Sequence, residues 1–349
     1  MADRKRVILH IGMAKTGTTS LQYYLWSNRK ELSNNGIGYY SEQLRPWTAY
    51  SNAGFLCGQS LNAARGWEWQ NPDYLSEMEA FTEFAKDYNT LILSEEFMWE
   101  KGIEEASFWR ELKNNIYLTV GEDTVIDIVV FLRRQDEWIL SRWKESLLSG
   151  SVKEERDFSE YLSNMDSAGF MDYDSALISI EKQFGRNHVT VCAYGASENE
   201  SFDTVSTFLS ATGINLRERD DIIITFRNPS LSMRAAKAML FINRQQNIII
   251  ARERIADTAR LFSMMYPDEK KYYPLSEEEH KILISKVKNI NRRVFDEYNN
   301  GINCFKKKSD SFKVWQDDYE QAKKDANSIL KLATLSNGTV KLLKKQVKT

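Results

Sequence analysis

Near its start the chain has an apolar run that leads into a glycine-rich loop, a combination that few folds accommodate. Residues 6–20 read RVILHIGMAKTGTTS. The β-branched and apolar residues before the loop are typical of a buried inner strand of a parallel sheet. Residues 18–35 predict a helix with three leucines on one side, and the run Asn34-Asn35-Gly36 ends it. A strand, a glycine loop and a helix in this order predict an α/β fold that binds an anion at the loop.

Strand and helix signals continue to alternate after this unit. Further strands are predicted at 37–41, 89–97, 123–134 and 188–195, and further helices at 78–89, 104–115, 135–150 and 172–184. This alternation predicts an α/β class chain, a P-loop-like three-layer fold whose central parallel sheet has helices on both faces. Segment 45–72, rich in Trp, Tyr, Asn and Gly, is interpreted as a long functional loop with short helical pieces.

Strand signals fade beyond about residue 220. Charged, amphipathic helices are predicted at 234–246, 277–299 and 317–333. We therefore expect two domains, an α/β core at 1–220 that binds the nucleotide and a mainly helical C-terminal region or cap at 221–349.

Composition excludes several classes of protein. With 42% hydrophobic and 28% charged residues, the 349-residue chain is typical of a globular protein. A net charge of −2 argues against bulk nucleic-acid binding. The cysteines Cys57, Cys192 and Cys304 lie far apart, so neither a disulfide framework nor a zinc site is indicated. No apolar stretch reaches the length of a membrane span, and the first one is too short for a signal peptide, so the expected location is cytoplasmic.

The loop itself departs from a nucleotide triphosphate site. Its spacing, Gly12-x-x-x-x-Gly17, is that of a P-loop, but Thr18 stands where the lysine is expected, and the lysine is Lys15. Triphosphate-hydrolysing loops also need an acidic residue at the end of another strand, whereas the strand at 123–134 ends in two arginines. This pattern favours a ligand with an extra phosphate over a triphosphate. The alternative is a tight strand-to-helix turn with a solvated lysine. The residues predicted to bind the anion are Ala14, Lys15, Thr16, Gly17, Thr18, Thr19 and Ser20.

Two segments resemble the motifs of a known family. HIGMAKTGTTSLQ is similar to the 5′-phosphosulfate loop of PAPS-dependent sulfotransferases, and VVFLRRQDEWILSRW is similar to their second motif, an arginine at a strand end with a serine eight positions later. The resemblance covers about 1–215 and is close to the bacterial, carbohydrate-type branch. It implies that Arg133 and Ser141 hold the 3′-phosphate, with Arg134 a less favoured ligand, and that Tyr194 lies near the adenine. Arg227, in FRNPSLS before a predicted helix, is expected to close over the nucleotide.

The resemblance also implies a reaction. PAPS donates a sulfuryl group, PAP leaves, and no metal is needed. Lys15 is expected to neutralise the bridging oxygen as PAP departs, which accounts for its place inside the loop. The family places its general base after the second or third strand, and the carboxylates there rank as Glu95, then Glu42, then Glu96. Ordinary acids at helix N-termini are the alternative for each. His10, inside the first strand, is interpreted as a core histidine.

The sequence thus predicts a PAPS-dependent sulfotransferase acting on an acceptor hydroxyl of a small molecule or glycan. The aromatic segment 45–72 favours a saccharide, although aromatic faces suit lipids and phenols equally. Two other functions stay open. A P-loop kinase would require ATP and Mg²⁺, and a non-catalytic nucleotide-binding module would bind PAP without turnover.

Overall fold

The computed structural model describes most of the chain, in two compact units that we treat separately. The described residues are 4–41, 51–57, 72–149, 153–195, 203–216, 230–245, 248–267, 272–298, 305 and 313–335. The first unit contains 1–134, 168–226 and 287–306, and the second contains 135–167, 227–286 and 307–349. The predicted division of the chain at residue 220 stays a prediction.

The first unit is built on a five-stranded parallel sheet with the order β2-β3-β1-β4-β5. The strands are β1 Arg6–His10, β2 Ile37–Tyr39, β3 Thr90–Ser94, β4 Val125–Leu132 and β5 Val189–Ala193. The register places Val7 beside Leu91 of β3 and Ile126 of β4. Because β1 is the central strand, the loop that follows it emerges in the middle of the carboxyl edge of the sheet, where α/β folds bind their ligands.

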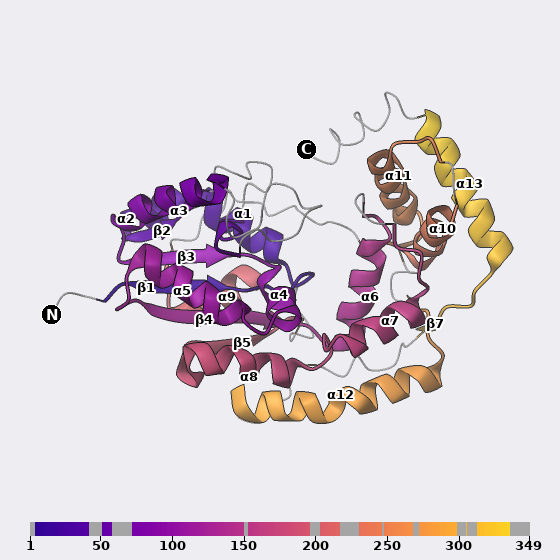
Figure 1. Ribbon diagram of the computed structural model, residues 1–349. Coiled ribbons are helices and arrows are strands. Elements are labelled where there is room, and N and C mark those ends of the chain that lie inside the picture. The colour runs from indigo at the N-terminus through magenta and orange to yellow at the C-terminus, as the bar shows by residue number, and fades with distance from the viewer. Residues whose placement is uncertain are drawn as a thin grey trace. The chain divides into compact units, whose positions relative to one another are not determined.

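Helices cover both faces of this sheet (Figure 1). They are α1 Thr18–Ser27, α2 Arg29–Asn34, α3 Pro72–Ala85, α4 Met98–Glu104, α5 Phe108–Val120, α8 Tyr173–Phe184 and α9 Thr204–Thr212, with 3-10 turns at Phe55–Cys57 and Arg186–His188. Ile8 of β1 packs in one core cluster with residues of α1 and α9. Its neighbours Val7 and Leu9 point to the opposite face and are also completely buried. The predicted α/β class and the parallel sheet with helices on both faces are confirmed.

Tertiary contacts determine where one predicted helix is interrupted and why a second, unpredicted helix forms. The predicted helix 18–35 is interrupted at Asn28, which is 1% exposed and whose Nδ2 donates to the carbonyl of Tyr24 at 2.9 Å. Helix α9, rich in Ser and Thr, was not predicted. It forms because Asp203 caps its first turn, accepting from the N–H of Val205 at 2.9 Å, and because it buries Phe208.

The second unit is mainly helical. Its elements are α6 Gln135–Ser146, α7 Phe158–Ser167, α10 Met233–Asn243, α11 Arg252–Met264, α13 Tyr319–Leu335 and a two-stranded parallel ladder of β6 Tyr272–Tyr273 and β7 Lys313–Val314, while α12 Glu277–Tyr298 begins in this unit and ends in the first. Fully buried alanines on α10 allow α13 to pack closely against it. Arg234 of α10 forms two 2.9 Å hydrogen bonds with the carboxylate of Asp325 on α13. No helix in the described part of the chain combines the length and apolar character that a membrane crossing needs.

Candidate anion-binding site

The glycine loop after β1 has a backbone that other residues would not adopt easily. Gly12 and Gly17 have φ values of +92° and +83°, in the left-handed region. A Cβ atom on Gly12 would lie 2.5 Å from the carbonyl oxygen of Glu96, and one on Gly17 would lie 2.4 Å from Oγ1 of Thr204. Both glycines are therefore required by close approach of neighbouring segments as well as by φ. Lys15, with φ +67°, is also left-handed.

The loop ends by presenting free backbone donors at the start of α1. The N–H groups of Gly17, Thr18 and Thr19 have no acceptor among the residues that the structure describes. Unpaired N–H groups at a helix N-terminus, together with the positive end of the helix dipole, form a ready site for an anion. Lys15, which is half-buried, adds a positive charge beside these donors.

The threonine hydroxyls of the loop have two different environments. Thr16 is completely buried and its Oγ1 donates to the carbonyl of Met13 at 2.5 Å. Oγ1 of Thr18 donates to the same carbonyl at 3.4 Å. These bonds hold the turn of the loop. Thr19 is exposed and Ser20 half-buried, so their hydroxyls are the more accessible donors.

Arg133, predicted from the second motif, lies against the glycine loop. Its Nη1 donates to the carbonyl of Lys15 at 3.2 Å, and its guanidinium carbon lies 5.5 Å from the ring centroid of Tyr194. The backbone of Arg133 is held by Tyr173, whose hydroxyl donates to the Arg133 carbonyl at 2.7 Å. The structure thus brings together three predicted residues, Lys15, Arg133 and Tyr194, from three separate segments.

Sequence reasoning missed Thr204 at this site. Its Oγ1 donates to the carbonyl of Thr16 at 3.2 Å and occupies the space that a side chain at position 17 would need. The two threonines are 188 residues apart in the chain. No local pattern signals such a contact.

The predicted base Glu95 follows β3, the strand beside β1. It is 2% exposed, and the hydroxyl of Ser51 donates to its Oε2 at 2.5 Å. Glu96 is half-buried, and its backbone is the surface on which Gly12 packs. Both carboxylates therefore belong to a segment in contact with the glycine loop.

Asn52 fixes the segment that carries Ser51. Its Oδ1 accepts from the N–H of Ser94 at 2.7 Å, its Nδ2 donates to the carbonyl of Ile92 at 2.9 Å, and its own N–H donates to the carbonyl of Ser94 at 3.2 Å. Asn52 is 1% exposed. Its amide thus extends the hydrogen bonding of β3 and holds Ser51 next to Glu95.

The interpretation of His10 as a core residue agrees with its surroundings. Burial lowers its pKa to about 3, so the imidazole is neutral at ordinary pH. Nδ1 of His10 lies 2.8 Å from Oγ of Ser94, which also accepts from Nε2 of Gln22 at 3.1 Å.

Three other predicted site residues stay predictions. Ser141 lies half-buried on α6 in the second unit, and its role as a 3′-phosphate ligand stays a prediction. Glu42 and Arg227 lie outside the described residues, as does most of the predicted loop at 45–72. In the described ranges no group of three or more His, Cys, Asp or Glu side chains is placed to hold a metal ion.

Comparison with known proteins finds no match to a protein family and none to a curated protein. Among solved structures, the chain is similar to a sulfotransferase from Alicyclobacillus acidocaldarius, with a TM-score of 0.34 and 13% sequence identity. That similarity covers 73% of this chain and 95% of the other.

Proposed function

We propose that this chain is a sulfotransferase that moves a sulfuryl group from PAPS to an acceptor hydroxyl. The observation that carries the proposal is the glycine loop. Three of its backbone N–H groups have no acceptor among the described residues, and the guanidinium of Arg133 donates to the carbonyl of Lys15 in the same loop. The loop offers an anion cradle. Arg133 adds a second cationic group suited to a phosphate, as guanidinium binds phosphate firmly and at two points. A nucleotide with phosphates at both its 5′ and 3′ positions fits this pair better than one with a single phosphate chain.

The proposed reaction is an in-line displacement at sulfur. The acceptor oxygen forms a bond to sulfur while the bond from sulfur to the phosphate oxygen of PAPS breaks, and PAP leaves with the electron pair. The acceptor proton passes to a carboxylate, for which Glu95 is the first candidate, Glu42 the second and Glu96 the third. Ser51 orients Glu95 through its 2.5 Å hydrogen bond. Lys15 stabilises the charge that develops on the departing phosphate oxygen.

Calorimetric titration with PAP, ADP and ATP, each with and without Mg²⁺, tests the proposal. We expect PAP to bind more tightly than ADP or ATP and to do so without the metal. Arg133→Ala should remove most of the preference for PAP over ADP because it deletes one of the two phosphate contacts. Tighter binding of ATP that requires Mg²⁺ would overturn the proposal.

The role assigned to Lys15 gives a kinetic prediction. Lys15→Ala should lower turnover by about 10²–10³-fold, the usual loss when one donor to a developing oxyanion is removed. The measurement is sulfuryl transfer from PAPS with the acceptor held constant. Lys30→Ala, which removes an exposed lysine of α2, is the matched control and should keep normal turnover. Near-normal turnover in Lys15→Ala would show that the lysine does not serve the breaking bond.

A second candidate function follows from the position of Glu95. It stands directly after β3, the strand beside β1, and an acidic residue at a strand end is what a P-loop enzyme uses to hold Mg²⁺. A kinase that uses ATP would therefore place its metal near Glu95. The two functions separate in the same titration, since only the kinase requires Mg²⁺ and prefers ATP.

A further inference from the structure

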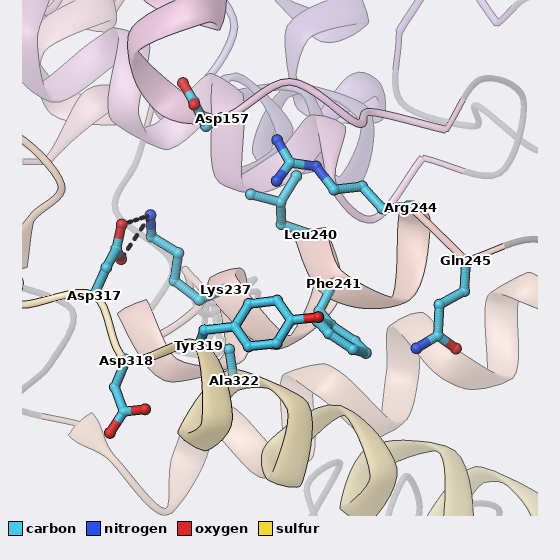
Figure 2. Close-up of a pocket in the computed structure, with 10 residues that line it drawn as sticks. All are labelled: Asp157, Lys237, Leu240, Phe241, Arg244, Gln245, Asp317, Asp318, Tyr319 and Ala322. Carbon is cyan, nitrogen blue, oxygen red and sulfur yellow. Dashed lines mark hydrogen bonds and ion pairs between the residues drawn. The ribbon is translucent and has the colours of Figure 1, made fainter.

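The second unit contains a pocket that the proposed reaction does not use. It has a volume of about 390 Å³, within the range of about 300–1,000 Å³ that is typical of small-molecule sites. It lies between the end of α10, the start of α13 and the residue that precedes α7, and all of its lining residues belong to this unit (Figure 2).

An aromatic pair forms one wall of the pocket. Tyr319, the first residue of α13, is 68% exposed, and its ring meets that of Phe241 edge-to-face at 5.5 Å and 65°. Leu240 and Ala322 complete the apolar lining. Figure 2 shows the Tyr319 ring at the centre of the group of lining side chains. The contact with Phe241 leaves most of the Tyr319 ring open to a ligand with an apolar face.

Hydrogen-bonding groups surround this wall. Arg244 uses Nε to donate to the carbonyl of Glu155 at 2.8 Å, and its other guanidinium nitrogens have no partner in the described part of the chain. The side-chain amide of Gln245 and the hydroxyl of Tyr319 are likewise without partners among the described residues. These groups provide donors and acceptors that a polar ligand can satisfy.

The carboxylates of the pocket limit the charge of its ligand. Asp317 is neutralised by Lys237 at 2.8 Å. Asp157 and Asp318 each use Oδ1 to accept from a helix N–H, that of Glu160 at 3.0 Å and that of Gln321 at 2.9 Å. The negative charges of Asp157 and Asp318 offset the positive charge of Arg244, so the pocket attracts an anionic ligand only weakly. A ligand hydroxyl can donate a hydrogen bond to the carboxylate oxygens that have no helix N–H.

We infer that this pocket binds a neutral sugar ring, with the apolar face of the ring against Tyr319 and its hydroxyls bonded to Arg244, Gln245 and the carboxylates. A saccharide is the ligand class that offers one apolar face together with many groups that both donate and accept. A lipid would leave the polar groups unpaired, and a nucleotide or a sulfated sugar would bring negative charge close to the carboxylates. The inference concerns the second unit alone and does not depend on PAPS chemistry.

Calorimetric titration of the full chain with neutral trisaccharides tests the inference. The probes are maltotriose, cellotriose and triacetylchitotriose, and we expect at least one to bind with a Kd of about 1 mM or tighter. Tyr319→Ala should weaken that binding about tenfold, as expected for loss of an aromatic contact. Gln245→Ala should also weaken it. Lys323→Ala, an exposed position on the same helix outside the pocket, is the matched control and should bind normally.

The outcomes separate this inference from the proposed function. If no neutral trisaccharide binds, or if binding is unchanged in both Tyr319→Ala and Gln245→Ala, the sugar pocket does not exist. Tighter binding of a monosulfated trisaccharide than of its neutral parent would equally overturn it. PAP binding should be the same in Tyr319→Ala and in the unmodified chain. A failure of PAP binding in the unmodified chain would count against the proposed function alone.

Discussion

The absence of a side chain at Gly17 lets Thr204, far away in the sequence, pack against the glycine loop. The position has φ +83°, and a Cβ atom added there would lie only 2.4 Å from Oγ1 of Thr204. Gly36 has a similar φ of +72° but no atom within 4 Å of the corresponding position. The pair therefore separates the effect of backbone conformation from the effect of contact.

Gly36→Ala should lower the free energy of unfolding by about 1–2 kcal/mol, the cost of a left-handed conformation for a residue with a Cβ atom. Gly17→Ala should lower it by at least about 1 kcal/mol more, because the new methyl group displaces Thr204 from the loop. Urea denaturation of both variants measures the difference. Equal losses would mean that Thr204 moves away from the loop without cost.

His10 makes the stability of the first unit depend on pH. Its pKa is about 3 in the folded chain, against an ordinary value of 6.5, because burial disfavours the charged imidazole. The unfolded chain therefore binds a proton that the folded chain does not. This contribution to stability is fully present above pH 6.5, and it is lost as the pH falls from 6.5 toward 3.

His10→Asn should remove this pH dependence. The difference in unfolding free energy between the unmodified chain and the variant should shrink by roughly 2 kcal/mol from pH 7 to pH 5, about 1.4 kcal/mol per unit below 6.5. Chemical denaturation of both proteins at the two pH values gives the result. A difference that stays constant would show that His10 accepts a proton in the folded chain.

Among the helices and strands, contacts between residues far apart in the chain stabilise structure that the local sequence pattern does not predict. The stretch from Thr204 to Thr212 has low helix propensity, yet its cap at Asp203 and the burial of Phe208 make it a helix. Asn52 shows the same effect at a strand, because its side chain extends the hydrogen bonding at the end of β3.

Asn52→Ala should lower the free energy of unfolding by about 1–3 kcal/mol, because the backbone groups of Ser94 and Ile92 lose partners in a buried place. Asn35→Ala is the matched control. It removes an exposed hydrogen bond of 2.8 Å to the carbonyl of Glu31 and should change stability by less than about 1 kcal/mol. Denaturation curves for the two variants decide the point, and similar losses would mean that the Asn52 bonds are replaced by water.

For the whole molecule, the main feature is that the chain divides into two compact units. The first is organised by the parallel sheet and the second by α10, α11 and α13. We expect a chain with two such units to unfold in more than one step. The ion pair between Arg234 and Asp325, in which the Asp325 side chain is 7% exposed, belongs to the second unit only.

Asp325→Ala should lower the stability of the second unit by about 3 kcal/mol, since it leaves Arg234 without its carboxylate in a partly buried place. Scanning calorimetry should then show one transition moving to lower temperature while the other stays. Asp317→Ala, which removes the far more exposed carboxylate that pairs with Lys237, should move neither by much. A single transition that shifts as a whole would mean that the units unfold together.

Local order in the sequence is enough to predict the α/β class, which the parallel sheet confirms, and the glycine loop that we propose binds an anion. Both depend on local order: a buried strand, glycines at 12 and 17, a lysine between them and an amphipathic helix. The resemblance of the second motif pointed to Arg133, and the position of Glu95 after a predicted parallel strand made it the first candidate for the base. Long-range packing brings Thr204 onto the loop, places Ser51, whose segment is fixed by Asn52, against Glu95, and puts Tyr319 and Arg244 in one pocket. Those contacts join residues far apart in the chain, and packing of the whole fold selects them where no local spacing does.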